Sequence, residues 1–338
     1  MKRIPMVARH YPAFWQQKGW QSGLLSPLGT LYGSLAQYRR DYYQRVAPKR
    51  SRPAAATIVV GNISVGGTGK TPLVNALVAR AQMLGFRPGV ILRGYAGKAR
   101  TVTQVSAHSR ADAVGDEALV IARRAQVPVV VGRRRVAAAN QLLAHHNVNL
   151  IISDDGLQHY ALPRDAEIAV IDGERGLGNA RCLPAGPLRE RPMRLNDVDL
   201  IVCNGDHHPL CTGRFSLIPG PLEALGSVIE PPTPGMRIHA VAGIGHPERF
   251  FNTLRALGFT VDGHALGDHH DFRREDLIFA DEQPVILTEK DAVKCADIAP
   301  ANSWQLPVTA EPDTQTAGQL EALIKTAVVR YQHGEKRL

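Results

Sequence analysis

The segment that decides the fold runs from residue 57 to residue 71 and opens with the apolar run Thr57-Ile58-Val59-Val60. It closes with the glycine-rich stretch Ser64-Val65-Gly66-Gly67-Thr68-Gly69-Lys70-Thr71. A strand that leads through such a turn into a helix points backbone N–H groups and the helix N-terminus at an anion. We therefore expect residues 64–71 to hold the phosphates of a nucleotide. Lys70 would reach the β- and γ-phosphates, and Thr71 would place its hydroxyl on Mg²⁺.

One residue departs from the usual phosphate-loop pattern. Ser64 stands six residues before Lys70, where that pattern has glycine. The other glycines and the strand–loop–helix context remain, so the prediction of a nucleotide site stands.

Short β runs alternate with helical patterns on both sides of this loop. The strands are expected at 57–60, 89–92, 128–131, 150–152, 168–171 and 200–202, and the helices at 71–84, 115–125 and 134–145. This alternation predicts an α/β fold, a P-loop NTPase-like parallel sheet with helices on both faces.

A Pro- and Gly-interrupted stretch follows, and then a second βα set. It has expected strands at 238–242, 259–265 and 285–287 and helices at 247–257 and 314–331. We expect residues 1–207 to form the nucleotide-binding domain together with an N-terminal amphipathic helix. Residues 208–338 would form a second, smaller α/β domain that closes the active-site cleft.

The composition is that of a globular protein, with 44% hydrophobic and 21% charged residues. No apolar stretch reaches the roughly 18 residues of a membrane span, and no apolar segment typical of a cleaved signal follows the basic N-terminus. The four cysteines are far apart and form no C-x-x-C pair. This spacing argues against a metal knuckle or a disulfide framework and favours a reducing compartment.

The net charge of +9 belongs to one segment of the chain. Residues 1–52 hold ten basic side chains and one acid, whereas the rest of the chain has thirty of each. This predicts an anionic partner for the N-terminus, and the neutral remainder argues against nucleic acid.

The leucines and tyrosines of 24–38 have helical spacing and run into Arg39 and Arg40, which suits a helix lying in lipid headgroups. Packing of the same face against the domain core is the alternative.

Three acidic clusters are candidates for chemistry. Asp154 and Asp155 follow the apolar strand at 150–152, where P-loop enzymes place a carboxylate that serves Mg²⁺. Asp116, at an expected helix start, is a candidate to accept the proton of an attacking hydroxyl, and a simple N-cap is the alternative. In Asp268-His269-His270-Asp271, His269 is a candidate for an Asp–His dyad, and a metal site or a solvated loop are the alternatives.

Seven motifs in order resemble the lipid A 4′-kinase family, the tetraacyldisaccharide 4′-kinases. They are Gly61-Asn62 with the phosphate loop, Arg93-Gly94-Tyr95, Val114-Gly115-Asp116-Glu117, Asp154-Asp155-Gly156-Leu157-Gln158-His159, Pro184-Ala185-Gly186-Pro187-Leu188-Arg189-Glu190, Asp268-His269, and Thr288-Glu289-Lys290-Asp291. The resemblance covers nearly the whole chain.

The resemblance implies transfer of the ATP γ-phosphate to the 4′-hydroxyl of an acylated glucosamine disaccharide 1-phosphate. The place would be the cytoplasmic face of a Gram-negative inner membrane, and the enzyme would be a peripheral monomer. Asp116 would be the base assisted by His269, and Asp154 and Asp155 would serve the metal and catalysis. Arg189 and Glu190 would line the site. The resemblance also favours membrane contact over core packing for the N-terminal helix.

Two other functions fit the loop itself. A partitioning-type switch ATPase has a similar loop but carries a lysine where this chain has Val65, which argues against it. A peripheral membrane scaffold that only binds nucleotide is the other alternative.

Overall fold

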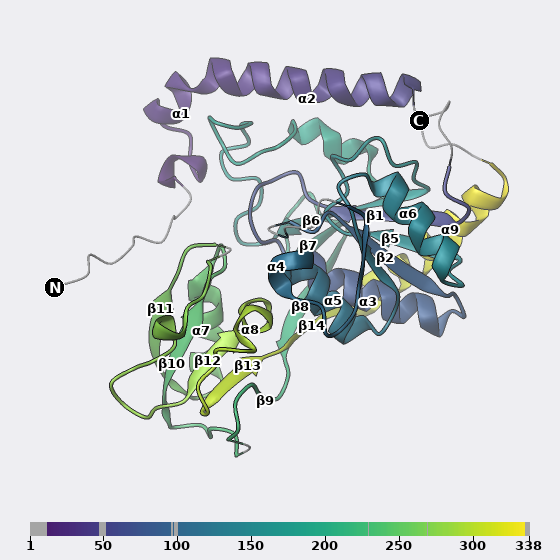
Figure 1. The fold of residues 1–338 in the computed structure, drawn as a ribbon. Helices are drawn as coiled ribbons and strands as arrows, with labels where there is room; N and C mark the ends of the chain where they lie inside the picture. The colour runs from purple at the N-terminus through teal and green to yellow at the C-terminus, as the bar shows by residue number, and fades with distance from the viewer. Residues whose placement is uncertain are drawn as a thin grey trace.

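The computed structural model describes residues 12–46, 52–95, 97, 101–228, 230–268 and 270–334 (Figure 1). The helices, including short 3-10 turns labelled η, are η1 (Ala13–Trp15), α1 (Trp20–Leu24), α2 (Ser26–Val46), α3 (Lys70–Met83), α4 (Ala111–Val114), α5 (Asp116–Ala125), α6 (Arg135–His145), η3 (Pro192–Asp197), α7 (Pro247–Ala256), η4 (Arg274–Asp276), α8 (Glu289–Cys295) and α9 (Thr314–Gln332). The strands are β1 (Ala56–Gly61), β2 (Pro88–Leu92), β3 (Thr103–Val105), β4 (Val129–Val131), β5 (Leu150–Ser153), β6 (Ala166–Asp172), β7 (Leu200–Asn204), β8 (Gly213–Pro219), β9 (Glu223–Ala224), β10 (Arg237–Ala242), β11 (Thr260–Ala265), β12 (Val285–Thr288), β13 (Ser303–Leu306) and β14 (Val308–Pro312).

The larger sheet has nine strands in the order β14-β8-β7-β6-β1-β5-β2-β4-β3. Its seven inner strands are mutually parallel, and the edge strands β3 and β14 are antiparallel to their neighbours. The phosphate-loop strand β1 lies between β5 and β6. The carboxyl ends of the central strands therefore meet at one edge of the sheet, where α/β proteins bind ligands.

Both faces of this sheet are covered, which confirms the predicted fold class. Alternate residues of β1 point to opposite faces. Ile58 and Val60 pack with apolar residues of α3, α5 and α9, whereas Val59 packs on the other face with residues of α6.

The smaller sheet has the order β11-β10-β12-β13-β9 and spans residues 223–306. Its strands are parallel except for β9. The two sheets do not divide the chain at residue 207, because β8, β14 and the packed helix α9 all belong to the larger lobe. The chain leaves the larger sheet after β8 and returns to it at β14. There β14 pairs antiparallel with β8 and forms the edge of the sheet. The smaller sheet with α7 and α8 is called the second lobe below (Figure 1).

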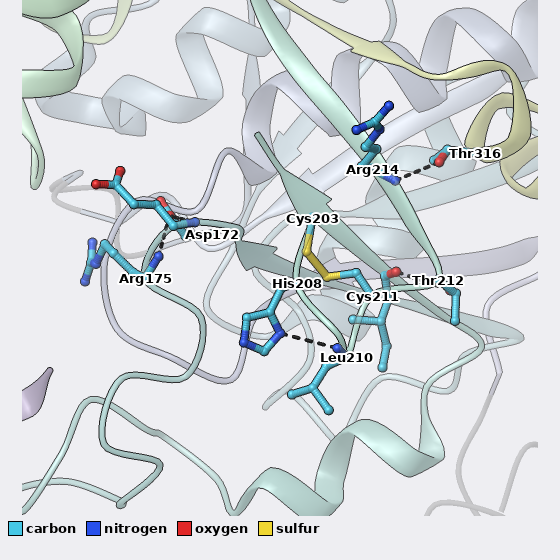
Figure 2. The surroundings of a disulfide bond; sticks show 11 residues. Asp172, Arg175, Cys203, His208, Leu210, Cys211, Thr212, Arg214 and Thr316 are labelled. Atoms are coloured by element: carbon cyan, nitrogen blue, oxygen red, sulfur yellow. Dashed lines mark hydrogen bonds between the residues drawn. A yellow bond between two sulfur atoms is a disulfide. The ribbon is translucent and has the colours of Figure 1, made fainter. Parts of the chain in front are cut away.

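A disulfide joins Cys203 at the end of β7 to Cys211 in the following loop, as Figure 2 shows. This differs from the expectation of unpaired cysteines. The loop turns back along β7, because the Thr212 amide donates to the Ile201 carbonyl at 2.9 Å, and this brings the two Cα atoms to 5.8 Å. Cys182 and Cys295 are free and buried.

Helix α2 lies along the outside of the larger lobe (Figure 1). Its contact face is made by Gly29 and Gly33, which lie so close to Cys182 that a Cβ at Gly29 would meet the Cys182 carbonyl oxygen at 2.7 Å. Arg40 extends this face through an ion pair of 2.6 Å with Asp197. The glycines rather than the leucines thus pack against the protein. None of the helices in the described part of the chain is long and apolar enough to cross a membrane.

Candidate active site

The phosphate loop connects β1 to α3 at the carboxyl edge of the larger sheet. Gly69 precedes the helix with a φ of 85°, a left-handed value that glycine adopts without strain. Two asparagines hold the loop: Asn62 donates to the Thr68 hydroxyl at 3.2 Å, and Asn204 donates to the Thr68 carbonyl at 3.2 Å. Ser64 is buried and pairs with Leu188, whereas Val65–Thr71 line an adjoining cavity. The two asparagines thus tie the loop to the residue after β1 and to the end of β7.

Asp154 lies directly beside the loop at the end of β5. Its Oδ2 accepts a hydrogen bond of 3.0 Å from the Thr71 hydroxyl, and the residue is only 1% exposed. Burial, with a further contribution from Glu117, raises the pKa of Asp154 to about 7. A buried carboxylate next to a hydroxyl is a set of hard oxygen donors, and a divalent cation would offset its desolvation. Two of the three predicted metal ligands, Thr71 and Asp154, thus fit Mg²⁺.

Asp155, the third predicted metal ligand, points toward basic side chains instead. Its Oδ1 lies 3.6 Å from the Lys70 ammonium, and both of its oxygens lie 3.2 Å from Arg189 Nη1. Burial alone would raise the pKa of Asp155, but Lys70 and Arg189 outweigh burial and lower it. Asp155 therefore orients Lys70 and Arg189 next to the phosphate loop.

Glu190, the neighbour of Arg189, is buried in a hydrogen-bond network. It accepts a bond of 2.7 Å from Gln158 Nε2 and another from the Tyr160 hydroxyl, and Arg194 lies 3.7 Å away. Gln158 also donates to the Asn62 carbonyl at 2.9 Å. Glu190 thereby connects the wall of the cavity to the base of the phosphate loop.

The cavity beside the loop has a volume of about 1200 Å³. Strand ends, α2 and the second lobe all contribute to its walls. The polar lining residues outside the phosphate loop include Arg39, Arg93, Glu117, Arg133, Arg135, Asp154, Asp155, Gln158, Asp172, Arg189, Glu190, Asn204, Arg249, Asp268 and Lys290, and the lining residues of α2 are Tyr32, Leu35, Ala36 and Arg39. Phosphate-binding groups and an aromatic and aliphatic surface thus face the same space.

The predicted base Asp116 begins α5 and is 3% exposed. Its Oδ2 lies 4.0 Å from the ammonium groups of both Lys290 and Lys294. Glu117, the next residue, lines the cavity, whereas Asp116 is buried and is not among the described residues that line it. The predicted partner His269 lies outside the described residues; its neighbour Asp268 lines the cavity, and His270 bonds to Asp276 at 2.9 Å.

The segment Thr288-Glu289-Lys290-Asp291 joins the two lobes. Thr288 caps α8 by accepting the Asp291 amide, and Asp291 accepts the Gly243 amide at 2.8 Å. Lys290 reaches across to Glu117 at 3.3 Å. Although burial would lower the pKa of Lys290, Glu117, Asp116 and Asp268 raise it above its usual range. The ammonium therefore stays charged within the acidic cluster.

Several cavity residues were not predicted from the sequence. Arg249 of α7 contacts Asp172 at 3.5 Å and Asn204 at 3.3 Å, so it joins the second lobe to two strand ends of the large sheet. Arg135 of α6 is buried and donates to the carbonyl oxygens of Gly132 and Asp154. Their positions at the carboxyl ends of strands β6 and β7 could have indicated Asp172 and Asn204, but no local pattern indicates the two arginines.

These features define a P-loop nucleotide-binding phosphotransferase. They are the glycine-rich loop between a parallel strand and a helix, the ion pair of Lys70 with Asp155, and the hydrogen bond of Thr71 to Asp154. The comparisons with known proteins narrow this class. The family model described as Tetraacyldisaccharide-1-P 4′-kinase matches residues 21–328. The chain therefore belongs to the tetraacyldisaccharide 4′-kinase family, as the ordered motifs predicted.

Similar proteins match over most of the chain. Tetraacyldisaccharide 4′-kinase of Alkalilimnicola ehrlichii is 51% identical over 317 residues, which cover 92% of this chain and 96% of that protein. The protein of the same name from Halorhodospira halophila is 46% identical, with coverage of 93% and 96%. The crystal structure of LpxK from Aquifex aeolicus in complex with ATP superposes with a TM-score of 0.73 at 25% identity, covering 91% of this chain and 99% of that one. The predictions of ATP as a substrate and of kinase activity are confirmed, and the switch-ATPase alternative is not supported.

Proposed function

We propose that the chain transfers the γ-phosphate of ATP to the 4′-hydroxyl of an acylated glucosamine disaccharide 1-phosphate, a step of lipid A biosynthesis. One observation carries the proposal: the phosphate loop and the amphipathic helix α2 border the same cavity, at Lys70 and at Tyr32 and Leu35. A soluble acceptor would need no apolar wall beside the phosphate site. An acylated sugar would need such a wall, because its acyl chains extend from one side of the polar headgroup and require an apolar surface there.

The proposed roles of the phosphate-loop residues follow from their surroundings. Lys70 is held by Asp155 at 3.6 Å and would neutralise charge on the transferred phosphoryl group. Thr71 and Asp154 would hold Mg²⁺, which neutralises charge on the phosphate oxygens when bound. Arg189 donates hydrogen bonds to Asp155 and adds positive charge at the cavity wall. Phosphoryl transfer depends chiefly on such positioning and charge, so these residues should matter most.

We propose Asp116, assisted by His269, as the acceptor of the proton from the 4′-hydroxyl. Its position beside Lys290 supports the proposal, because the second lobe closes over it there. Glu117 is the competing carboxylate, since it lies at the cavity surface. Substitution of each in turn separates the two assignments.

We propose that α2 rests on the cytoplasmic face of the inner membrane and that the enzyme acts there as a peripheral monomer. Leu28 and Leu31 are 54% and 58% exposed. At about 100° per residue Leu31 lies on the side of the helix opposite Gly29 and Gly33, which contact the protein, and Leu28 lies at the flank of that side. An exposed apolar stripe with Arg39 beside it suits an anionic lipid surface.

A transfer assay in detergent micelles tests the proposed function. The protein is mixed with γ-labelled ATP, Mg²⁺ and the disaccharide 1-phosphate, and label is followed into the lipid fraction. The expected result is label in the lipid that depends on both Mg²⁺ and Lys70. Competent, ATP-binding protein that leaves the lipid unlabelled would refute the proposal.

A further inference from the structure

Two histidines and two aspartates cluster in the second lobe, away from the phosphate loop. His239 lies on β10, Asp262 and His264 lie on the neighbouring strand β11, and Asp281 lies in the loop before β12. His239 pairs with Asp262 in the parallel register. Because alternate residues of a strand share a face, His264 lies on the same face as Asp262. The sheet itself thus brings the three side chains together.

The donor atoms of this cluster are spaced like the ligands of one ion. His239 Nδ1 lies 3.0 Å from His264 Nε2 and 3.8 Å from Asp262 Oδ2, and the three donor atoms all lie within 4.8 Å of one another. Ligands of tetrahedral zinc, about 2.0–2.1 Å from the metal, are separated by about 3.4 Å. Small side-chain rotations would therefore bring all three onto a metal ion.

Asp281 fixes the orientation that a metal needs. Its Oδ1 lies 2.7 Å from His239 Nε2 and accepts a hydrogen bond from the Nε2–H, so the Nδ1 lone pair of a neutral His239 points to His264 and Asp262. A carboxylate behind a ligating imidazole is the usual support of a protein-bound metal. Phe279 stacks on His239 at a ring-centroid distance of 3.8 Å and limits its rotation.

The exposure of the cluster also suits a bound ion. His239 is buried, whereas Asp262 and Asp281 are nearly half exposed, so an ion could enter from solvent and keep a water molecule. Arg237 lies 3.4 Å from the same Asp262 oxygen, but its own side chain is 60% exposed and can turn into solvent. The positive charge of Arg237 thus need not oppose metal binding.

We propose that His239, His264 and Asp262 form a site for a divalent transition metal, with zinc as the best fit. Two imidazoles and one carboxylate favour zinc over Mg²⁺, which prefers oxygen ligands. The site is structural, because His239, Asp262 and His264 do not line the active-site cavity, whereas His246, beyond the end of β10, does. A metal there would fasten the edge strand β11 to β10 and to the loop that holds Asp281.

Calorimetric titration with ZnCl₂ tests the site. The full chain, freed of affinity tag and treated with chelator, is titrated in buffer with excess Mg²⁺, and thermal unfolding is recorded with and without zinc. We expect one zinc ion per chain and a higher Tm. His264→Ala and Asp262→Ala should each weaken binding at least tenfold and remove the Tm shift, whereas His108→Ala, at an exposed site elsewhere, should behave like the parent protein. Asp281→Asn should weaken binding by about 10–100-fold.

Two results would overturn the proposal: no zinc uptake by the parent protein, or the same uptake by the His264→Ala and Asp262→Ala variants. ATP binding by each variant, measured in parallel, reports whether it is folded. The zinc test does not depend on the kinase assay, so its failure leaves the proposed function untouched.

Discussion

Lys70 is the cation of the phosphate loop, oriented by Asp155 at 3.6 Å. Lys70→Met keeps the side-chain length but removes the charge that would oppose the transferred phosphoryl group. We expect kcat to fall by about 10²–10³, the usual effect of removing one transition-state contact. Steady-state kinetics in micelles measures this, and circular dichroism controls for folding. A variant that keeps more than a tenth of the parent kcat would contradict the proposed role.

Asp116 and Glu117 are adjacent but face different surroundings. If Asp116 is the base, Asp116→Asn should lower kcat by about 10²–10⁴ and leave the KM for ATP nearly unchanged. Glu117→Gln is the matched control, because it removes one carboxylate charge at the neighbouring position. A larger loss of kcat in Glu117→Gln than in Asp116→Asn would move the base to the cavity surface.

His159 makes stability depend on pH. Burial, with a smaller contribution from Arg135, lowers the pKa of His159 from 6.5 to about 4. Between these values the unfolded chain binds more protons than the folded one. The contribution of neutral His159 to the free energy of unfolding is therefore fully present above pH 6.5 and is lost as the pH drops toward 4. The parent protein should lose up to about 1.4 kcal/mol per pH unit more than His159→Asn in this window. Urea unfolding at several pH values measures the difference, and equal slopes would contradict the assignment.

At the scale of elements, helix α2 has one face that contacts the protein and another face of exposed apolar side chains. Its glycines pack on the larger lobe, and Leu28 and Leu31 are exposed. Leu31→Glu should reduce co-sedimentation with anionic vesicles about tenfold or more, since one buried leucine is worth about 1.5–3 kcal/mol. Thr30→Glu introduces the same charge at the exposed neighbouring position, between the two faces, and should have a smaller effect. Equal losses in both variants would indicate that charge alone, not insertion of the apolar face, governs binding.

The phosphate loop could be predicted from sequence because its structure is local. Strand β1, the glycines and Lys70 are adjacent in the chain, and the same holds for β5 with Asp154 and Asp155. Strands β8 and β14 were not predicted, because β14 joins the sheet only by pairing with β8 across some ninety residues, and β8 has a single buried residue, Phe215. The Cys203–Cys211 contact likewise depends on a loop that turns back along β7. Long-range pairing of this kind leaves no periodic signal in the chain.

At the scale of the whole molecule, the two lobes are joined by ionic contacts over the cavity. Arg124 of α5 binds both oxygens of Glu223, at 2.8 and 2.7 Å, and also contacts Glu289 of α8. Which charges meet across the lobes could not be predicted, because Arg124, Lys290 and Arg249 lie on elements that only the tertiary fold brings together. These contacts set how closely the second lobe approaches the phosphate loop.

Arg124→Ala should loosen that approach. Because the pair is partly exposed, we expect a loss of only about 1 kcal/mol, seen as a several-fold rise in the KM for ATP and a lower Tm. Arg123→Ala, on the adjacent exposed arginine, is the control. Identical KM and Tm values in the two variants would show that the contact does not hold the lobes together.

The position of the transferred phosphate is the measurement that decides between a lipid kinase and a nucleotide-binding protein of any other kind. The purified chain is incubated with ATP, Mg²⁺ and the disaccharide 1-phosphate in micelles, and the lipid product is examined by phosphorus NMR and mass spectrometry, with Lys70→Met in parallel. We predict one added phosphate monoester on the 4′ carbon, with the original 1-phosphate intact and at least about a hundredfold slower product formation by Lys70→Met. Release of inorganic phosphate without a modified lipid, or addition at the 1-phosphate, would contradict the proposed function.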